Sequence, residues 1–511
     1  MTEDFEFDLD KLAEEFEQAT FKSNEPPKTM KDLENRIILA GQKWRADRTK
    51  TIIKDGKEET KAPPRPNVSE VAENLNRLVD FALVGKGDNT DKLQLYIYDI
   101  DKGIYTSNDD LFNKFCRLFD NRVAPKDWGQ VKTMVRTMAT QKAPLTDPEL
   151  IPVGNGIVNL KTKELLPFSP KYVITSKIAT EYHAHSVVPK DREGNTFENW
   201  LNSIACGDSE IVTLLMQLMQ EAINSNYTRG KFAILYGEGN NGKGTFQRLL
   251  LNLIGETNVS ALKPTDFSEK HALEMLEGKV CNIGDDFPNT YLKNASNLMS
   301  ITTGDTVMVN PKGRKGYEAS YKLFNIFSGN YIPNSGNKSH GWYRRVMIVP
   351  FNADFNGEIE KPWIKNEFLA DKKVLEYVLY KVINQPSFDK FIEPQAVKDL
   401  LEEYKEDNDY ILAWVKDEYI AKNWHELDVV PIPFVTDKLK IYAKDMGIDN
   451  PKLYGAGKLV AKSLNALTDN HYKVKRTRMK KSDFPILNPS NFETDNKRLS
   501  GVNRSIVKDD C

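Results

Sequence analysis

The sequence predicts an α/β protein with a Gly-rich loop near the middle of the chain, a mixed α/β unit before it and a basic helical unit after it. At residues 231–250 a short apolar run breaks into the Gly-rich loop and continues as an apolar helix. At residues 93–119 a strand pattern precedes an amphipathic helix pattern. At residues 434–481 two helix patterns joined by a turn precede an alternating basic strand. These three patterns define the fold class and the order of its parts.

The length of 511 residues corresponds to three or four domains, since a domain has about 150 residues. We expect an acidic, partly disordered region over 1–90, a mixed α/β domain over 91–195, a central α/β domain over 196–395 and a helical, basic domain over 396–511. The chain has 71 basic and 73 acidic residues. This balance excludes an overall basic field, so any surface for nucleic acid has to be a local patch.

Cysteine usage indicates a reducing compartment. The cysteines show no spacing typical of a zinc site or a disulfide framework, so no structural zinc is expected; they are Cys116, Cys206, Cys281 and Cys511. The sequence shows neither a secretory leader nor an apolar span of about 20 residues. We therefore expect no membrane association and a cytoplasmic location, which is the host cytoplasm if the chain is virus-encoded.

The first 90 residues combine an acidic stretch, Glu3–Phe16, with Pro-containing segments, which predicts a largely flexible region. A solvated tail, a docking peptide for a partner and a mimic that competes with DNA are alternative roles for the acidic stretch. Residues 91–195 instead predict ordered structure. A strand is expected at Leu93–Asp99 and an amphipathic helix at Leu111–Phe119.

The Gly-rich loop has the pattern of a phosphate cradle. Its glycines allow consecutive backbone N–H groups to point at phosphate oxygens, the following helix N-terminus adds partial positive charge, and Lys243 reaches the outer phosphates. This pattern predicts binding and hydrolysis of a nucleoside triphosphate, ATP, with Mg²⁺. The candidate nucleotide-binding residues are Gly237, Glu238, Gly239, Asn240, Asn241, Gly242, Lys243, Gly244 and Thr245.

The loop departs from the usual pattern at one position. A hydroxyl that ligates Mg²⁺ is expected directly after the lysine, where this chain has Gly244, so we assign Thr245 to that role. The same glycines match a dinucleotide fingerprint, but no acid follows about 20 residues later, as that fingerprint requires. A chance Gly-rich turn is the third interpretation.

Two adjacent acids, Asp285 and Asp286, end an apolar run that begins near Gly278. In nucleotide hydrolases such acids hold Mg²⁺ and polarise the attacking water, so Asp285 joins Thr245 as a candidate metal ligand. The alternative is an ordinary acidic turn. A separation of about 40 residues from Lys243 leaves room for one helix and one strand between the two motifs.

Residues 301–322 predict a hairpin of two alternating runs around a basic tip that contains Lys312, Arg314 and Lys315. A solvated turn is the alternative. The hairpin is followed by an apolar strand that ends at Asn330, an amide suited to orienting water or sensing a terminal phosphate.

A pair of arginines, Arg344 and Arg345, enters the next apolar strand. An arginine in this position is suited to reach the nucleotide of a neighbouring subunit and stabilise transition-state charge there.

In this order the motifs resemble the superfamily 3 helicases, and in particular the poxvirus, phage and plasmid primase-helicase group. Residues Ile151–Pro170 resemble the upstream helicase-associated domain of that group, so the resemblance spans about residues 95–360. It implies an AAA+ P-loop motor core behind an α/β collar-like domain. The region before the core is too short for the primase domain of that group, so primase activity is not expected.

The resemblance also implies how such a motor is assembled. A homo-hexamer would encircle one DNA strand and move 3′ to 5′, with ATP at subunit interfaces and the basic hairpin in the channel. Lys312, Arg314 and Lys315 would contact phosphates, which suits movement along any sequence. Of the two arginines, the spacing from Asn330 in the superfamily favours Arg345 as the trans-acting one.

The C-terminal residues predict a winged-helix DNA-binding domain. Residues 471–481 contain six basic residues in eleven and no acid; the candidate phosphate contacts on this wing are Lys473, Lys475, Arg476 and Arg478. Lys458 and Lys462 on the preceding helix are placed to enter a major groove. The alternative is a charged surface tail on a structural helical cap.

Taken together, these features predict an ATP-dependent replicative DNA helicase of a phage, plasmid or other mobile element. Expected partners are single-stranded and forked DNA, origin duplex DNA if the wing recognises an origin, and a separate primase or other replication proteins. The alternative is an origin-binding initiator that uses ATP as an assembly switch with little processive unwinding. A small-molecule kinase or dehydrogenase is a third interpretation, but it leaves the basic hairpin and wing unexplained.

Overall fold

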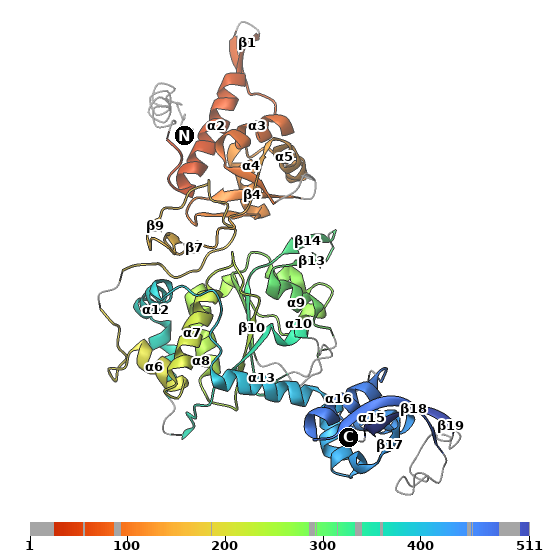
Figure 1. The fold of residues 1–511 in the computed structure, drawn as a ribbon. Coiled ribbons are helices and arrows are strands. Elements are labelled where there is room, and N and C mark those ends of the chain that lie inside the picture. Colours follow the sequence, from red (N-terminus) through yellow and green to blue (C-terminus); the bar gives the residue numbers. More distant parts are fainter. Residues whose placement is uncertain are drawn as a thin grey trace.

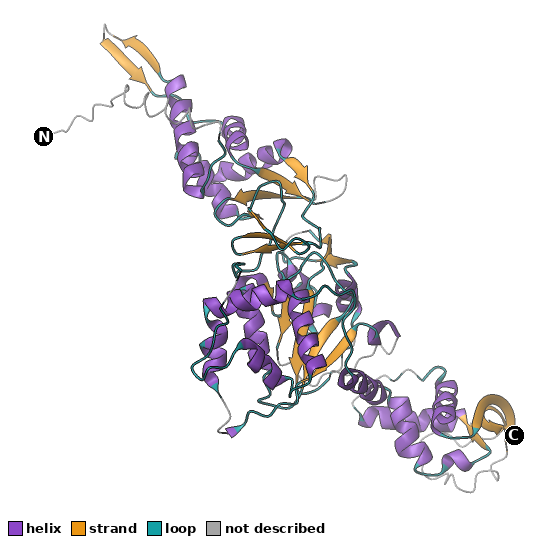
Figure 2. Ribbon diagram, turned by 60° about the vertical axis from the view of Figure 1, so that its left-hand side comes forward, coloured by secondary structure: helices purple, strands orange, loops and turns teal. Residues whose placement is uncertain are grey.

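The three bodies of the molecule follow one another along an elongated chain, as the computed structural model shows (Figures 1 and 2). The structure describes residues 25–54, 57–85, 93–184, 187–285, 292, 294–313, 315–332, 340–357, 361–446, 451, 453–479 and 501–509. Within these ranges, no helix combines the length and the apolar character that crossing a lipid bilayer requires.

The N-terminal body packs helices against a small sheet. Its helices are α2 (Met30–Arg48), α3 (Val68–Leu78), α4 (Asp109–Phe119) and α5 (Pro125–Met138). Its sheet has the order β5-β4-β3-β6, with β3 (Phe81–Val84), β4 (Gln94–Asp99), β5 (Ile104–Thr106) and β6 (Thr140–Lys142). A separate hairpin of β1 (Lys50–Lys54) and β2 (Lys57–Lys61) protrudes at the end of α2 (Figure 1). The predicted strand and helix of residues 93–119 are confirmed as β4 and α4.

Local sequence explains α4. The side chain of Asn108 caps the helix by accepting the N–H groups of residues 110 and 111. Phe112, Phe115 and Phe119 recur at helical spacing and are buried in the core of this body.

The predicted boundary at residue 90 is wrong. Strands β3 and β4 lie on either side of it and pair in an antiparallel ladder, so they belong to one sheet. Helices α2 and α3 supply buried side chains to the same core, so this part of residues 1–90 is ordered and belongs to the N-terminal body. The acidic stretch Glu3–Phe16 lies outside the described residues.

A small antiparallel sheet connects the N-terminal body to the central one. It consists of β7 (Leu150–Val153), β8 (Gly156–Asn159) and β9 (Leu165–Leu166). Ile151, Val153 and Val158 from this sheet are part of the central hydrophobic core. The predicted domain of residues 91–195 is therefore divided between the two bodies.

The central body is built on a parallel sheet of five strands in the order β11-β12-β15-β10-β16. The strands are β10 (Phe232–Tyr236), β11 (Val259–Ser260), β12 (Cys281–Gly284), β15 (Phe324–Gly329) and β16 (Val346–Pro350). The helices are α6 (Phe197–Ile204), α7 (Ser209–Ala222), α8 (Lys243–Ile254), α9 (Ser296–Thr303), α10 (His340–Tyr343), α11 (Pro362–Asn366), α12 (Lys372–Asn384) and α13 (Gln395–Asn408). A parallel α/β sheet is thus present, as the fold-class prediction required.

Strand β10 shows why both faces of this sheet are covered. Phe232 and Ile234 belong to one hydrophobic cluster, whereas Ala233 and Leu235 belong to another. Because side chains alternate across a strand, the two clusters lie on opposite faces of the sheet. Near-continuous apolar runs are typical of strands buried in this way.

The strand order argues against the dinucleotide interpretation. In a dinucleotide-binding fold, the strand that follows the Gly-rich loop and its helix lies beside the first strand. Here that next strand, β11, lies at the far edge, and β15 and β12 separate it from β10.

The predicted hairpin is present as β13 (Thr306–Val309) paired with β14 (Tyr317–Ser320). It begins later than expected, because residues 301–303 form the end of α9. Gly304 ends that helix with a φ of 73°, a conformation that glycine adopts readily.

The C-terminal body contains α14 (Tyr410–Trp414), α15 (Ile432–Asp445) and α16 (Ala456–Leu467). Its antiparallel sheet has the order β17-β19-β18, with β17 (Val429–Pro431), β18 (His471–Met479) and β19 (Gly501–Asp509). The preceding helix α13 belongs to the central body, since Tyr404 lies in a central cluster and its hydroxyl accepts a hydrogen bond from Trp342. The predicted boundary at residue 396 is therefore placed about one helix too early.

Candidate functional site

The Gly-rich loop lies between the end of β10 and the start of α8. Gly242, directly before the helix, has a φ of 93°, and Asn240 has a φ of 52°. A Cβ on Gly237 would lie 2.3 Å from both the Asn241 side-chain nitrogen and the Phe351 carbonyl oxygen. Glycine at 237 is required by this close approach, and glycine at 242 by its left-handed backbone.

Lys243 is folded into the loop. Only 8 % of its surface is exposed. Its ammonium group donates to the Gly237 carbonyl oxygen at 2.5 Å and lies 3.3 Å from Asn330 Oδ1. Lys243 and Asn330 are 87 positions apart in the sequence, and they meet because each follows one of the adjacent parallel strands β10 and β15.

Asp285 follows β12, the next strand in the sheet. The Ser328 hydroxyl lies 2.5 Å from Asp285 Oδ1 and 3.1 Å from the side-chain oxygen of Gln247. Gln247 is one turn after Lys243 on α8, so a chain of polar groups joins the predicted acid to the helix that carries the predicted lysine. Asp286 lies outside the described residues.

Sequence reasoning missed Ser328 and Gln247. Two signals were available: Ser328 is a hydroxyl inside an otherwise apolar strand that ends near Asn330, and Gln247 lies four residues after Lys243. Both are buried polar side chains, which are expected to have hydrogen-bond partners.

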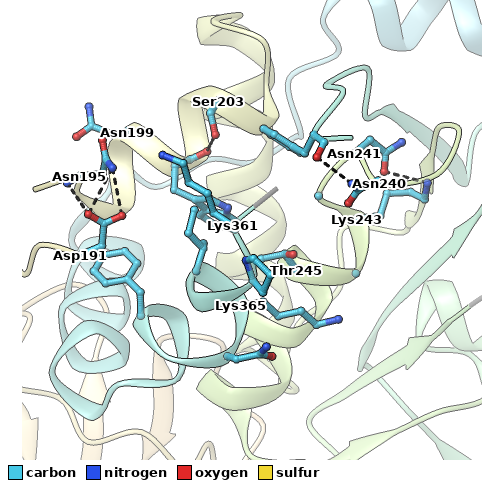
Figure 3. Close-up of a pocket in the computed structure, with 18 of the residues that line it drawn as sticks. Asp191, Asn195, Asn199, Ser203, Asn240, Asn241, Lys243, Thr245, Lys361 and Lys365 are labelled. Carbon is cyan, nitrogen blue, oxygen red and sulfur yellow. Dashed lines mark hydrogen bonds between the residues drawn. The ribbon is translucent and has the colours of Figure 1, made fainter. Parts of the chain in front are cut away.

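A pocket of about 650 Å³ adjoins the loop on the side of α6 and α11 (Figure 3). Residues Asn240–Thr245 supply one wall; the other walls include Asn199 and Ser203 from α6, and Lys361 and Lys365. Thr245 lines this pocket, whereas Asp285 is not among its lining residues. Of the two predicted metal ligands, only Thr245 therefore faces this pocket.

Asp191 lines the same pocket but has a structural role. It accepts the backbone N–H groups of Glu193 and Asn195 at 2.9 Å and 2.8 Å. Burial alone would raise the pKa of Asp191, but these hydrogen bonds hold it below its usual value.

Arg344 and Arg345 precede β16 and differ sharply in environment. Arg345 is only 9 % exposed, and one of its guanidinium nitrogens donates to the Gly341 carbonyl oxygen at 2.7 Å. Burial lowers the pKa of Arg345, as does Arg344 beside it, whereas Asp305 acts in the opposite direction. Arg344 is exposed. The geometry therefore does not favour Arg345 as the group that reaches another subunit.

The tip of the β13–β14 hairpin exposes Lys312 and Lys315, and Arg314 lies outside the described residues. The end of the hairpin next to its tip is tied to the N-terminal body through Glu277. The Tyr317 hydroxyl donates to Glu277 at 2.6 Å, and the hydroxyl of Tyr96 on β4 lies 3.5 Å from the other oxygen of the same carboxylate.

The predicted basic wing corresponds to β18. The side chains of Lys473, Lys475, Arg476 and Arg478 are all exposed. Arg476 lies directly opposite Arg504 of β19. Like charges in such a cross-strand pair repel each other, so an anionic ligand would relieve this repulsion.

Helix α16 presents a second exposed surface in the same body. Lys458 and Lys462 are exposed and lie one turn apart. Tyr454, in the turn just before α16, is fully exposed. Sequence reasoning missed Tyr454, although its spacing of four residues from Lys458 was visible in the sequence.

Comparison with known protein families gives two matches. Residues 97–206 match the model of a family described as D5 N terminal like. Residues 235–345 match a family of unknown function (DUF5906). The second match includes the Gly-rich loop, Asp285, the hairpin and Asn330.

The chain also has weak similarity to solved structures of the NrS-1 C-terminal region. One apo structure aligns with 12 % identity and a TM-score of 0.46, and another with 13 % identity and the same TM-score. Each alignment covers 87 % of this chain and 100 % of the other. Similarity at this level is too low to establish a shared fold or function.

Proposed function

We propose that this chain is an ATP-dependent DNA helicase of a phage, plasmid or related mobile element, built on an AAA+ P-loop core. The main support is the meeting of Lys243 and Asn330 at the carboxyl ends of adjacent parallel strands, with Asp285 one strand further on. Ligands of open α/β sheets bind at this edge. The match of residues 97–206 to the D5 N terminal like family supports the same assignment.

The loop provides the chemistry that a triphosphate requires. In the structure, loop carbonyl and amide oxygens accept hydrogen bonds from the Lys243 ammonium group. We infer that phosphate oxygens replace these acceptors, while the N–H groups at the start of α8 bind the inner phosphates. Asn330 beside Lys243 is then placed to orient water or sense the terminal phosphate.

Thr245 and Asp285 are the residues proposed to hold Mg²⁺. When bound, the ion would neutralise phosphate charge and polarise the phosphoryl oxygens. Thr245 fits this role because it lines the pocket beside the loop. Asp285 fits less directly, since its carboxylate is already engaged by Ser328.

The proposed assembly is a homo-hexameric ring that moves 3′ to 5′ on single-stranded DNA. Its basic hairpins would line the channel, and a separate primase or other replication protein would work beside it. The exposed Arg344 is the better candidate for the trans-acting arginine, because Arg345 is buried and held within its own turn.

The test of this function is ATP hydrolysis by purified protein with and without single-stranded DNA, together with strand displacement on a duplex that carries a 3′ tail. DNA-stimulated turnover with displacement is the expected result. Displacement that requires a 5′ tail would contradict the proposed direction, and absence of ATP binding would contradict the function itself.

The hairpin variant Lys312→Ala with Lys315→Ala should lose strand displacement by at least about tenfold, because two phosphate contacts in the channel are removed. ATP binding should be unchanged, since neither side chain lines the pocket. Lys373→Ala, an exposed lysine on α12 of the central body, is the matched control. Displacement at the wild-type rate in the hairpin variant would contradict its role in the channel.

An origin-binding initiator is the second candidate function, and the C-terminal body favours it. We propose that this body is a winged-helix domain, with α16 directed at a major groove and β18 at phosphates. Slow ATP turnover that DNA does not stimulate, without strand displacement but with specific duplex binding, would favour the initiator over the helicase.

The wing variant Lys473→Ala with Lys475→Ala should weaken duplex binding about equally for all sequences. The slope of log affinity against log salt should become shallower by about one for each lysine that binds a phosphate in the wild-type protein. Fluorescence anisotropy at several salt concentrations measures both effects, with Lys390→Ala as the control. An unchanged salt slope would exclude these lysines as phosphate ligands.

A further inference from the structure

We propose that Lys365 of α11 is a second phosphate-binding lysine, which contacts the α- and β-phosphates of the nucleotide from within the same subunit. This inference rests on the proposed function and concerns the same pocket. Gly244, which follows Lys243, has no side chain and therefore leaves room for a cation from another part of the chain.

The ammonium group of Lys365 lies close to the first turn of α8. A Cβ on Gly244 would lie 3.8 Å from the Lys365 ammonium nitrogen. Apart from the adjacent residues and the backbone of its own helix, no other heavy atom of the described residues would lie within 4 Å of it. Lys365 and Thr245 both line the pocket (Figure 3). The ammonium group is thus directed at the first turn of α8, beside the residue without a side chain.

The charged residues around Lys365 form ion pairs, whereas Lys365 does not pair with any described residue. The neighbouring charges are neutralised, because Lys361 pairs with Glu193 and Glu367 pairs with Arg192. Lys365 has no ion pair or hydrogen bond with any residue that the structure describes. It is exposed toward the pocket while the charges on either side of it are occupied.

The segment around Lys365 is also held in place. Trp363 lies beneath the guanidinium group of Arg192, 5.0 Å from the ring centre. Ile364 packs against the central core, and buried Phe368 follows within one turn. Lys365 therefore extends from a fixed backbone rather than from an unanchored loop.

Positive charge is concentrated at the N-terminal end of α8. The N-terminal end of a helix bears partial positive charge, so nearby cations are unfavourable there unless an anion binds. The first turn of α8 contains no acidic residue. Two lysines, Lys243 and Lys365, therefore meet the positive end of one helix without a carboxylate in that turn, which favours a polyanion as the ligand.

The two lysines should contact different phosphates. In a phosphate cradle the N–H groups at the start of the helix surround the α- and β-phosphates, whereas the loop lysine reaches the β- and γ-phosphates. Because Lys365 lies beside Gly244 at the start of α8, it should bind ATP and ADP equally. Such uniform binding lowers KM and leaves kcat unchanged.

The test compares Lys365→Gln with wild type in titrations of fluorescently labelled ATP and ADP and in steady-state ATP hydrolysis. We expect Kd for both nucleotides to rise about tenfold, an effect within the range of hydrogen bonds to charged groups. KM should rise similarly, while kcat stays within about twofold. Lys365→Arg should retain most of the affinity, and Lys373→Ala, an exposed lysine outside the pocket, should behave as wild type.

The outcomes separate this inference from the proposed function. If wild type binds and hydrolyses ATP but Lys365→Gln binds both nucleotides as tightly, Lys365 is not a phosphate ligand and the function stands. A fall in kcat at unchanged Kd would also overturn the inference, because Lys365 would then act in the transition state. If wild type binds neither nucleotide, the proposed function fails and the inference fails with it.

Discussion

Lys243→Ala should lower the kcat of ATP hydrolysis by roughly 10² to 10³, the range found when one preorganised transition-state donor is removed. Lys243 is the buried cation of the Gly-rich loop, and its ammonium group lies within reach of Asn330. Without it, the charge that develops on the outer phosphates would lose the lysine nearest to it, and only the backbone N–H groups, the proposed Mg²⁺ and the proposed trans-acting arginine would remain to stabilise that charge. Strand displacement should disappear together with turnover.

The control for this variant has to separate chemistry from folding, because Lys243 also holds the loop through its bonds to Gly237 and Asn241. The circular dichroism spectrum of Lys243→Ala should match that of wild type. In a thermal melt, its free energy of unfolding should be lower only by the loss of a few hydrogen bonds, about 1 kcal/mol each. If the folded variant hydrolyses ATP with a kcat within about threefold of the wild-type value, Lys243 does not take part in the chemistry.

Arg344→Ala should reduce ATP turnover in the assembled protein by about 10³ to 10⁵, the range of a trans-acting arginine. The reason is that Arg344 is exposed before β16, whereas Arg345 is buried and donates to Gly341. Arg345→Ala should instead lower the melting temperature, because it removes a buried side chain. Parallel assays of hydrolysis and thermal unfolding of the two variants distinguish these effects.

A mixing experiment tests whether Arg344 acts on a neighbouring subunit. Lys243→Ala subunits keep Arg344, and Arg344→Ala subunits keep an intact loop, so co-assembly creates interfaces in which both groups are present. Turnover should recover in the mixture although each variant alone is inactive. If the mixture is no more active than its parts, Arg344 does not act in trans.

The sequence predicted the secondary structure around the Gly-rich loop and the hairpin well, because its determinants are contiguous. The end of β10, the Gly-rich loop and the start of α8 all lie within residues 232–243, and alternating polarity was sufficient to place the β13–β14 hairpin. The basic alternation of residues 471–478 likewise predicted an exposed strand. Each prediction depended on backbone periodicity or on glycine at positions that neighbouring residues define.

Domain boundaries were predicted less well, because they depend on pairing between distant segments. The segment around residue 90 resembles a linker in composition, but β3 and β4 on either side of it form one ladder. Helix α13 resembles the start of a new unit, but Trp342 donates a hydrogen bond to Tyr404 and holds the helix to the central body. Composition alone does not encode these contacts.

Sequence by itself determined the α/β class, the Gly-rich loop with Lys243, and the order of acid, hairpin, amide and arginines along the chain. Tertiary structure alone decided that Asn330 lies beside Lys243, that Ser328 engages Asp285, that Arg344 rather than Arg345 is exposed, and that Lys365 approaches Gly244. The physical reason is that strand order and side-chain burial arise from packing among residues far apart in sequence, whereas glycine conformation and hydrophobic periodicity are properties of neighbours.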